Sequence, residues 1–432
     1  MKAIIMAGGK GTRLGNVTKT IPKPMVEISG KPVLEHEIEC LKQYGFTDII
    51  ITISYLGHFI KDYFGDGHKW GVNIEYFEEE KPLGNAGALF FLKEHIYEDF
   101  LLINADSIFD INLDKFVSYH QEKKSLATLF THPNNHPYDS GLIFADRSSR
   151  VIRWLAKEDE RPAYYRNRVN AGIHILSPKV LDNEKIEKLL HDELKFKVDL
   201  DRDILKPLLS SGRVFCYDSP EYVKDMGTPD RYQQVCDDFE SGLVQRKNLT
   251  NKQKAVFLDR DGVINEHVGF LNNPNDFVLL PEVAEAIAKI NRSGYLAICV
   301  TNQPVIARGE LTFDGLETIH NKMEALLGKE HAYLDAIYYC PHHPDKGFKG
   351  EIPELKIVCD CRKPKAGMLL QAAKDYNIDL SSSWMIGDDE RDIQAGKAAG
   401  CRTVFIGKSN CQQDITVNSL FDAVKEILGR GL

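Results

Sequence analysis

Short runs of consecutive apolar residues recur along the first half of the chain. They are separated by segments whose apolar residues return every three or four positions. Runs of this length are typical of strands in a sheet that is covered on both faces. Leu34, Ile38 and Leu41 have the helical spacing, and Gly45 is well placed to end that helix. Strands are expected at 2–6, 49–53 and 100–103.

The same alternation continues in the second half of the chain. Val283, Ile287 and Ile290 form a helical stripe that is expected to end before Gly294. Repeated strand–helix alternation predicts an α/β fold in which parallel strands predominate. Such sheets bind ligands beyond the carboxyl ends of their strands, so motifs that follow strands carry the most functional information. Strands are expected here at 254–258 and 295–300.

The chain is long enough for more than one domain, because 432 residues suit two or three. Residues 237–254 are polar, mixed in charge and without clear periodicity. A second strand-like run begins at their end. We therefore expect a first domain at 1–240, a linker at 241–253 and a second domain at 254–432.

Composition narrows the class of partner. Hydrophobic residues make up 43% and charged residues 27%, as is typical of soluble globular proteins. The net charge of -9 disfavours non-specific binding to nucleic acid or to an anionic membrane. No apolar run approaches the roughly 18 residues that span a bilayer, and the apolar start is too short for an export signal. We expect a cytoplasmic protein that acts on small molecules, alone or as a homo-oligomer.

A glycine-rich loop follows the first predicted strand. It reads Gly-Gly-Lys-Gly-Thr-Arg-Leu over 8–14, and Pro-Lys-Pro follows at 22–24. Glycines let the backbone approach a ligand and turn N–H groups toward it, which suits a polyphosphate, while Arg13 and Lys23 add positive charge. On this motif alone, a glycine turn with two solvated cations is an equal alternative. The spacing matches neither the P-loop nor the dinucleotide-binding pattern.

Five ordered motifs give residues 1–240 a resemblance to the sugar-1-phosphate nucleotidylyltransferases. The glycine loop with its Pro-Lys-Pro is similar to the family signature. The others read Pro-Leu-Gly-Asn-Ala-Gly-Ala, Asn-Ala-Asp, Asn-Ala-Gly and Asp-Met-Gly-Thr-Pro, with Asn85 where the family has threonine. The resemblance implies a Rossmann-like domain with a mixed sheet. These four motifs begin at Pro82, Asn104, Asn170 and Asp225.

The resemblance also implies roles for these residues. Asp106 and Asp225 would hold Mg²⁺, while Arg13 and Lys23 would offset the charge of the departing pyrophosphate and the reacting phosphates. Such a transfer needs positioning and charge neutralisation rather than a protein nucleophile. Lys157 is the candidate for a sugar-phosphate contact, because Ala-Lys-Glu-Asp stands where many members have Glu-Lys-Pro; a solvated surface lysine is the alternative. The implied nucleotide-binding residues are Gly8, Gly9, Gly11, Thr12, Arg13, Pro82 and Gly84. The implied sugar-phosphate contacts are Lys23, Gly87, Lys157, Asn170 and Gly172.

Polar residues end three predicted strands of the second half. Asp259 and Asp261 follow the first of them, and side chains two positions apart on a strand point the same way. Thr301 ends the next strand. Asp388 and Asp389 follow a later one, where the second aspartate either assists the first or caps the following helix. Taken alone, the first aspartate pair is also compatible with an Asx turn.

Together with Lys363 before a helix, these segments resemble the four motifs of the haloacid dehalogenase-like phosphatases. The resemblance covers roughly residues 252–430 and implies a parallel sheet. It implies that Asp259 attacks phosphorus to form an aspartyl-phosphate, and that Asp261 is the general acid and later the general base. Thr301 and Lys363 would bind the transferring phosphoryl group. The implied Mg²⁺ ligands are Asp259, the backbone carbonyl of Asp261, and Asp388.

Three cysteines and a histidine form two tight pairs in this half. Cys340 and His342 make one pair, and Cys359 and Cys361 make the other. Three thiolates and an imidazole suit tetrahedral Zn²⁺, and four protein ligands leave no open position, so the metal would be structural. The alternative is buried cysteines beside an exposed His342 or His343.

Within the phosphatase family, two segments resemble the D-glycero-D-manno-heptose 1,7-bisphosphate 7-phosphatases. They read Cys-Pro-His-His-Pro and Cys-Asp-Cys-Arg-Lys-Pro, and the family pattern selects His342 as the zinc ligand. Pro304 and Val305 replace the usual serine and glycine of that family. The histidinol-phosphate phosphatases share much of this pattern. The implied substrate contacts are Asn302, Gln303, Arg308 and Arg362.

Joined, the two halves predict a bifunctional enzyme of nucleotide-sugar biosynthesis. The second domain would remove the 7-phosphate of the heptose bisphosphate. The first would transfer a nucleotidyl group, with GTP implied by the pairing, to heptose 1-phosphate. The resemblance implies GDP-D-glycero-α-D-manno-heptose as the product, for a lipopolysaccharide, capsule or S-layer glycan. The implied cofactors are Mg²⁺ in both domains and structural Zn²⁺. Alternatives are another hexose 1-phosphate paired with histidinol phosphate, or one half kept as a binding module, which the complete catalytic set disfavours.

Overall fold

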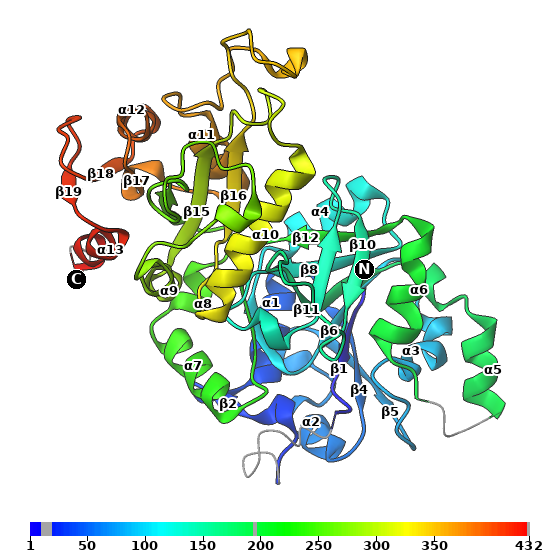
Figure 1. Cartoon of the computed structure of the whole chain (residues 1–432). Coiled ribbons are helices and arrows are strands. Elements are labelled where there is room, and N and C mark those ends of the chain that lie inside the picture. Colours follow the sequence, from blue (N-terminus) through cyan, green and yellow to red (C-terminus); the bar gives the residue numbers. More distant parts are fainter. Residues whose placement is uncertain (10–19, 193–196, 430–432) are drawn as a thin grey trace. The chain divides into compact units, whose positions relative to one another are not determined.

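The computed structural model describes residues 1–9, 20–192 and 197–429, which form two compact units (Figure 1). The first unit contains Met1–His132, Ile143–Trp154 and Asn170–Asn248. The second contains Leu249–Leu432 together with Pro133–Leu142 and Leu155–Val169. Two segments from the first half of the chain thus group with the second half, a grouping that no periodic pattern in the sequence indicates.

The first unit is built on a nine-stranded mixed sheet, as the family resemblance implied. Its path runs β10-β9-β11-β6-β1-β4-β5, with β8 paired to β11 and β12 paired to β8. Strands β6, β1, β4 and β5 are parallel, whereas β11 runs antiparallel to β6. The strands are β1 (Ala3–Met6), β4 (Asp48–Ile53), β5 (Asn73–Glu78), β6 (Phe100–Asn104), β8 (Ala127–His132), β9 (Leu142–Ala145), β10 (Val151–Leu155), β11 (Val169–Leu176) and β12 (Val214–Asp218).

Apolar residues cover both faces of this sheet, which explains the continuous apolar runs in the sequence. Ile5, Ile51 and Ile103 pack in one core cluster, while their chain neighbours Ile4 and Ile50 pack in another. Successive strand side chains point to opposite faces, so a strand buried on both sides has no polar alternation. The strands predicted at the start of the chain, at 49–53 and at 100–103 are confirmed.

Helices and short ribbons complete the first unit. The predicted helix over Leu34 to Leu41 is confirmed as α1, and Gly45 follows it with the positive φ of +78° that glycine adopts at little cost. Two antiparallel ribbons join β2 (Glu27–Ile28) to β3 (Lys31–Pro32) and β7 (Ser107–Asp110) to β13 (Tyr222–Asp225). The helices are α1 (Val33–Gln43), α2 (Gly57–Phe64), α3 (Gly87–Phe91), α4 (Leu113–Lys123), α5 (Glu184–Asp192), α6 (Lys206–Leu208), α7 (Pro229–Glu240) and α8 (Leu243–Arg246).

The second unit is built on a six-stranded sheet in which every strand pair is parallel, as predicted. The order is β16-β15-β14-β17-β18-β19, so β14 lies near the middle between β15 and β17. The strands are β14 (Lys254–Leu258), β15 (Tyr295–Asn302), β16 (Ala336–Cys340), β17 (Trp384–Gly387), β18 (Arg402–Ile406) and β19 (Ile415–Val417). The helices are α9 (Val283–Ser293), α10 (Phe313–Lys329), α11 (Gly367–Tyr376), α12 (Glu390–Ala399) and α13 (Leu420–Gly429).

One of the two segments that join the second unit, 155–169, is held by a buried ion pair on α10. Arg168 Nη1 lies 3.1 Å from Glu324 Oε1, and both side chains are at most 5% exposed. Arg168 also donates to the backbone carbonyls of Asn167 and Asp335, at 2.7 and 3.3 Å. A buried pair of this kind tolerates the loss of either partner poorly. The interaction therefore fixes the 155–169 segment to α10 within this unit.

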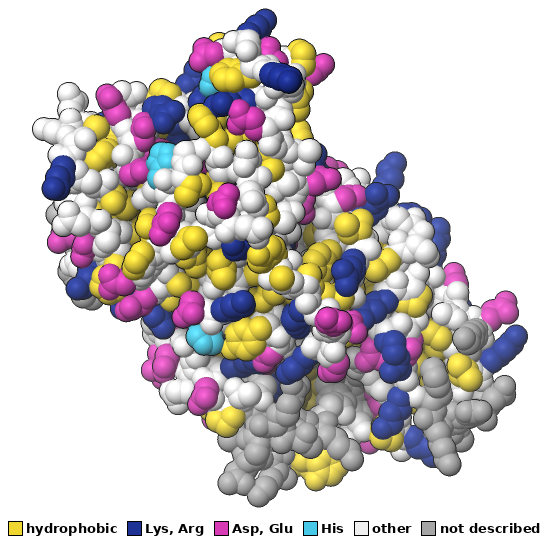
Figure 2. Space-filling model, viewed as in Figure 1, with side chains coloured by type: hydrophobic (Ala, Val, Ile, Leu, Met, Phe, Trp, Pro, Cys, Tyr) yellow, Lys and Arg dark blue, Asp and Glu magenta, His cyan; other side chains and the backbone are white. Residues whose placement is uncertain are grey.

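The region expected as a linker, 241–253, begins with ordered structure. It contains α8, and the side chain of Asn248 donates to Asp110 at 2.6 Å. Charged side chains of both signs are interspersed on the face of the molecule drawn in Figure 2. Among the helices of the described residues, none is both long and apolar enough to cross a membrane.

Candidate active sites

Strand pairing brings together the backbone of the two aspartates predicted to hold Mg²⁺ in the first unit. Asp106 follows β6, and Asp225 ends β13. In the β7–β13 ribbon, Asp225 lies opposite Ser107, the residue after Asp106. Met226 donates its backbone N–H to the Asp106 carbonyl at 3.2 Å, which continues the pairing. Two segments more than a hundred residues apart thus place their carboxylates on adjacent backbone.

Cations accompany both carboxylates. Lys23 is only 7% exposed, and its Nζ lies 2.9 Å from Asp106 Oδ2. Arg231 Nη1 lies 3.1 Å from each oxygen of Asp225, and the Gly227 N–H donates to the same carboxylate at 2.8 Å. Carboxylate oxygens are the hard ligands that Mg²⁺ prefers. The donor set therefore fits the predicted ion, which would compete with Lys23 for Asp106.

A pocket of about 640 Å³ opens beside these groups. Its lining includes Lys23 and Asp106, together with four of the predicted nucleotide-binding residues. At Gly84, φ is +88° and an added Cβ would lie 2.3 Å from the Val198 carbonyl oxygen, so the close approach requires glycine. The four residues are Gly8, Gly9, Pro82 and Gly84.

The pocket lining also includes two residues that the sequence motifs did not predict, Glu79 and Lys197. Glu79 accepts the Leu83 N–H at 3.0 Å, and burial raises the pKa of its carboxyl group. Of the predicted residues, Gly11, Thr12 and Arg13 lie outside the described residues.

Four predicted sugar-phosphate contacts are not among the described residues that line the pocket. Gly87 begins α3, and Asn170 accepts hydrogen bonds from the Gly172 N–H and from His174 at 3.3 and 3.1 Å. Lys157 is 55% exposed, lies 3.7 Å from Asp139, and belongs to a segment of the second unit. Its role as a sugar-phosphate contact stays a prediction, as do the roles of the other three.

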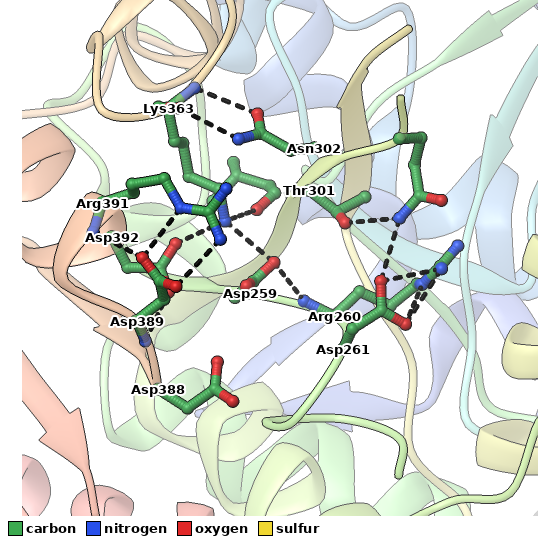
Figure 3. Close-up of polar contacts among 12 residues, drawn as sticks. Asp259, Arg260, Asp261, Thr301, Asn302, Lys363, Asp388, Asp389, Arg391 and Asp392 are labelled. Atoms are coloured by element: carbon green, nitrogen blue, oxygen red, sulfur yellow. Dashed lines mark hydrogen bonds and ion pairs between the residues drawn. The ribbon is translucent and has the colours of Figure 1, made fainter. Parts of the chain in front are cut away.

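In the second unit, the carboxyl ends of three neighbouring strands converge on one buried lysine (Figure 3). Asp259 follows β14, Thr301 lies near the end of β15, and Asp388 follows β17. Lys363 is 2% exposed, and its Nζ lies 2.8 Å from Asp259 and 2.6 Å from Asp392. It also donates to the Val300 carbonyl at 2.8 Å. The lysine thus neutralises charge where the motifs predicted a phosphoryl group.

The carboxylates of this site fit a divalent cation. Asp259, Asp388 and Asp392 offer oxygen atoms within 4.8 Å of one another. Burial and the Asp392 carboxylate raise the pKa of Asp259 to about 7, while burial and the charge of Asp259 raise that of Asp388 to about 6. Burial lowers the pKa of Lys363, but the two carboxylates beside it outweigh that effect and raise it. One lysine leaves excess negative charge, which an ion with a preference for oxygen would relieve.

Asp392 is the residue that sequence reasoning left unassigned. Asp389 is the N-cap of α12, and Asp392 completes a capping box by accepting the Asp389 N–H at 3.2 Å. The helix-capping alternative for Asp389 is therefore what the structure shows. Asp392 combines this cap with its contact to Lys363. The only signal in the sequence is an acidic residue three positions into a helix, which usually means a cap.

The side chain of Asp261 turns away from the lysine toward Arg260, as Figure 3 shows. Arg260 Nη2 lies 2.9 Å from Asp261 Oδ2, and Gln303 donates to the same oxygen at 3.0 Å. Gln303 also bonds the Thr301 hydroxyl at 2.8 Å. The implied metal contact of Asp261 runs through its backbone carbonyl and stays a prediction.

The predicted zinc ligands lie together. The Sγ atoms of Cys340, Cys359 and Cys361 are 3.2 to 3.5 Å apart, and His342 Nδ1 lies 3.6 Å from Cys340 and 3.3 Å from Cys361. Around tetrahedral Zn²⁺, with Zn–S near 2.3 Å, such separations are about 3.5 to 3.8 Å. The hydrogen bond between the Cys340 and Cys361 thiols lowers the pKa of Cys361 to about 5. His343 instead contacts Asp345.

The remaining predicted substrate residues are held around this centre. Asn302 exchanges two hydrogen bonds with the Lys363 backbone, both at 3.0 Å. Arg362 donates to the His342 carbonyl at 3.2 Å, so the thiol cluster anchors it. The Arg308 guanidinium lies over the rings of Phe270 and Phe348, 3.9 and 4.4 Å from their centroids.

The fold and the two sites define an enzyme with one centre of nucleotidyltransferase type and one of haloacid dehalogenase type. A family model described as Nucleotidyl transferase matches residues 2–242, and one described as HAD-hydrolase-like matches 360–421. The chain is 41% identical over 181 residues to the D-glycero-beta-D-manno-heptose-1,7-bisphosphate 7-phosphatase of Haemophilus ducreyi, covering 40% of this chain and 97% of that protein. The same phosphatase of Escherichia coli K12 is 42% identical, with 40% and 93% covered. The chain belongs to the nucleotidyl transferase family and, through its second half, to the family of these phosphatases; it is a bifunctional enzyme.

Solved structures match each half separately. HddC from Yersinia pseudotuberculosis, also solved in complex with GMP-PN, is 28% identical with a TM-score of 0.47, covering 55% of this chain and 99% of that one. The D,D-heptose 1.7-bisphosphate phosphatase from B. bronchiseptica, complexed with magnesium and phosphate, is 31% identical with a TM-score of 0.37. It covers 41% of this chain and 99% of its own.

Proposed function

We propose that this enzyme carries out two consecutive steps, with catalytic domains at 1–240 and 254–432. The second domain removes the 7-phosphate of D-glycero-D-manno-heptose 1,7-bisphosphate. The first transfers GMP from GTP to the resulting heptose 1-phosphate, giving GDP-heptose and pyrophosphate. One observation carries the proposal: the second half is 41% identical to a heptose-bisphosphate phosphatase over 97% of that protein, in a chain whose first half is a nucleotidyl transferase.

The phosphatase step uses Asp259 as the nucleophile. Its carboxylate attacks the phosphorus of the 7-phosphate while the bond to the sugar oxygen breaks, and Asp261 gives that oxygen a proton. Asp261 then takes a proton from water, which attacks the aspartyl-phosphate and releases phosphate. Lys363 offsets the charge of the transferring group throughout. Mg²⁺, held by Asp259, Asp388 and the Asp261 carbonyl, would lower the repulsion between phosphate and carboxylates.

The nucleotidyl transfer is direct. An oxygen of the sugar 1-phosphate attacks the α-phosphorus of GTP, and the bond to pyrophosphate breaks. Lys23 offsets charge at the reacting phosphates, Arg13 steadies the leaving group, and the glycine backbone approaches the nucleotide. Mg²⁺ held by Asp106 and Asp225 would neutralise the α-phosphate.

The thiol cluster acts as a structural zinc site that orders the loop before Lys363. With four protein ligands, Zn²⁺ has no open position for substrate, so its contribution is folding free energy. The backbone of His342 holds Arg362, which we place at the substrate. Because both reactions use cytoplasmic metabolites, we place the enzyme in the cytoplasm, supplying a surface glycan such as lipopolysaccharide, capsule or S-layer.

A substrate panel tests the proposal. The full-length enzyme is incubated with Mg²⁺ and heptose 1-phosphate, plus GTP, ATP, CTP, UTP or dTTP in turn, and pyrophosphate is measured. We expect GTP to be preferred by at least about tenfold in kcat/KM. Phosphate release is compared between heptose 1,7-bisphosphate and histidinol phosphate, with the former expected to dominate. Preference for histidinol phosphate, or for another base, would replace the corresponding half of the proposal.

The anomer is a separate question, and the names of the relatives favour one answer for the phosphatase. Both relatives described above are named for the β-anomer, whereas the guanylyltransferase pairing predicted from the sequence implies an α-anomeric product. Measuring kcat/KM on the α- and β-bisphosphates, and then transfer to the α- and β-1-phosphates, decides between them. The two halves act consecutively only if they prefer the same anomer.

A further inference from the structure

Three side chains hold the carboxylate of Asp261: Arg260 and Asn265 from the loop after β14, and Gln303 from just after the end of β15. Arg260 donates to it through Nε at 3.2 Å and through Nη2, which spans both oxygens at 3.0 and 2.9 Å. Asn265 donates to one oxygen and Gln303 to the other, each at 3.0 Å. Such a network fixes the direction of the carboxylate as well as its position.

Arg260 is the largest of the fully buried side chains, with 0% exposure. Its other face meets α10, where Nη1 lies 3.3 Å from His320 Nε2. His320 is 7% exposed, and burial together with the charges of Arg260 and Arg166 lowers its pKa below the ordinary value. The imidazole is therefore neutral, and its Nε2 can accept the hydrogen bond from the guanidinium.

We propose that Arg260 is a positioning residue that orients the carboxylate of Asp261, and that His320 fixes Arg260 in turn. The proposal rests on the proton-transfer role of Asp261 given above. A buried ion pair is often no more stabilising than apolar side chains of similar volume, so folding alone does not require an arginine here. A general acid also needs a defined position, and these contacts hold the Asp261 carboxylate on the side away from Lys363, where we place the leaving oxygen.

The support continues along α10 to the buried ion pair of the 155–169 segment. Glu324 lies one helical turn after His320, so both side chains project from the same face of the helix. Arg168 binds Glu324 at 3.1 Å and also donates to the backbone carbonyl of Asp335. Arg168 thus fixes the stretch of α10 that carries His320, and acts on Asp261 through His320 and Arg260.

The test compares two leaving groups in the full-length enzyme. Heptose 1,7-bisphosphate releases an alcohol that needs a proton, whereas 4-nitrophenyl phosphate releases a phenolate that does not. Because kcat/KM reports steps up to formation of the aspartyl-phosphate, it isolates the acid role of Asp261. Asp261→Asn should lower kcat/KM for the sugar phosphate by about 10²- to 10⁴-fold and that for the nitrophenyl ester only a few-fold.

Arg260→Gln should reproduce this selective loss at about 10- to 100-fold on the sugar phosphate, carried by kcat rather than KM. Arg260→Lys keeps the charge without the planar fork and should recover part of it. His320→Leu removes the hydrogen-bond acceptor of Arg260 and should cause a smaller loss of kcat/KM on the sugar phosphate. His320→Gln supplies an acceptor again and should recover that activity. Lys289→Ala, which breaks the exposed Lys289–Glu285 pair at 3.2 Å, is the matched control. It should leave kcat/KM unchanged for both substrates.

Equal losses on both substrates in Arg260→Gln and His320→Leu would show a purely structural role and overturn the proposal. If Asp261→Asn itself shows no dependence on the leaving group, the proton-transfer role assigned to Asp261 is wrong. This outcome is distinguishable from a failure of the positioning role of Arg260 alone. Arg168→Gln tests the outer support: we expect about a threefold loss confined to the sugar phosphate, and an equal loss on both esters would remove Arg168 from the network.

Discussion

The two candidate active sites contain the same kinds of charge arranged differently. In the first unit, Lys23 pairs with one carboxylate, Asp106, at 2.9 Å beside a pocket of about 640 Å³. In the second, Lys363 lies between two carboxylates, 2.8 Å from Asp259 and 2.6 Å from Asp392. Direct transfer between two bound substrates needs room for both, whereas covalent transfer needs a compact site around one attacking carboxylate.

The strongest way to break this comparison is to remove the attacking carboxylate. Asp259→Asn should lower phosphate release by at least about 10⁴-fold, because an amide cannot form the phosphorylated intermediate. Pyrophosphate release from GTP and heptose 1-phosphate should change less than about twofold. Steady-state assays of both reactions measure this, with Glu285→Gln on the exposed face of α9 as control. Equal loss of both activities in a folded variant would mean that the sites are not independent.

The mirror experiment removes the lysine of the first unit. Lys23→Ala should lower pyrophosphate release by about 10²- to 10³-fold, because charge at the reacting phosphates is no longer offset. Phosphate release from the bisphosphate should be unchanged. Lys31→Ala, at a lysine whose side chain is 43% exposed, is the matched control. Full nucleotidyl transfer by the Lys23 variant would show that Asp106 needs no cation at this position.

A third experiment sharpens the contrast by testing the proposed structural zinc site of the second unit. Metal analysis of the purified enzyme should find about one zinc per chain. Cys359→Ser should lose it and lower the melting temperature of the phosphatase unit, by about 2–4 °C for each kcal/mol lost. Cys411→Ser, at a thiol outside the cluster, should have no such effect. A zinc-free enzyme with full phosphatase activity would contradict the structural-metal proposal.

The smallest expected effect is a pH dependence of stability in the first unit. Burial lowers the pKa of His174 to about 3. Because the unfolded chain binds the proton near pH 6.5, stability is complete above that pH and falls as the pH drops toward the folded value. Between pH 7.5 and 5.0 this group should cost about 2 kcal/mol of unfolding free energy. Urea unfolding should show a smaller drop for His174→Gln; an identical drop would assign the acid sensitivity to other groups.

The helices and strands that could be predicted are those whose apolar pattern is compatible with only one kind of secondary structure. β4 and β6 are apolar on both faces and continuous in sequence, and α9 has a helical stripe that ends at a glycine. The positions of the candidate catalytic side chains at strand ends were predictable for the same reason, because the carboxyl ends of parallel strands meet at one edge. Asp259, Thr301 and Asp388 illustrate this.

What could not be predicted depends on contacts between distant segments. Arg168 reads as an ordinary arginine until Glu324 is placed beside it, and the grouping of 133–142 and 155–169 with the second unit follows from such contacts. Asp392 looked like a helix cap, and it is one, but its second contact is with a lysine 29 positions earlier. Local patterns carry no information about pairings of this kind.

The buried Arg168–Glu324 pair also bears on how such a fused gene could be divided. A fragment that begins after Asn248 would retain Glu324 but lose the arginine that neutralises it. The same cut removes the 155–169 segment that packs over Glu324, so the carboxylate loses its cover together with its partner. Arg168→Leu in the full chain is the different case, because Glu324 stays covered and the loss of its partner should cost about 3–5 kcal/mol. A separated phosphatase would therefore present this face of α10 to water, and a polar residue such as glutamate suits that environment.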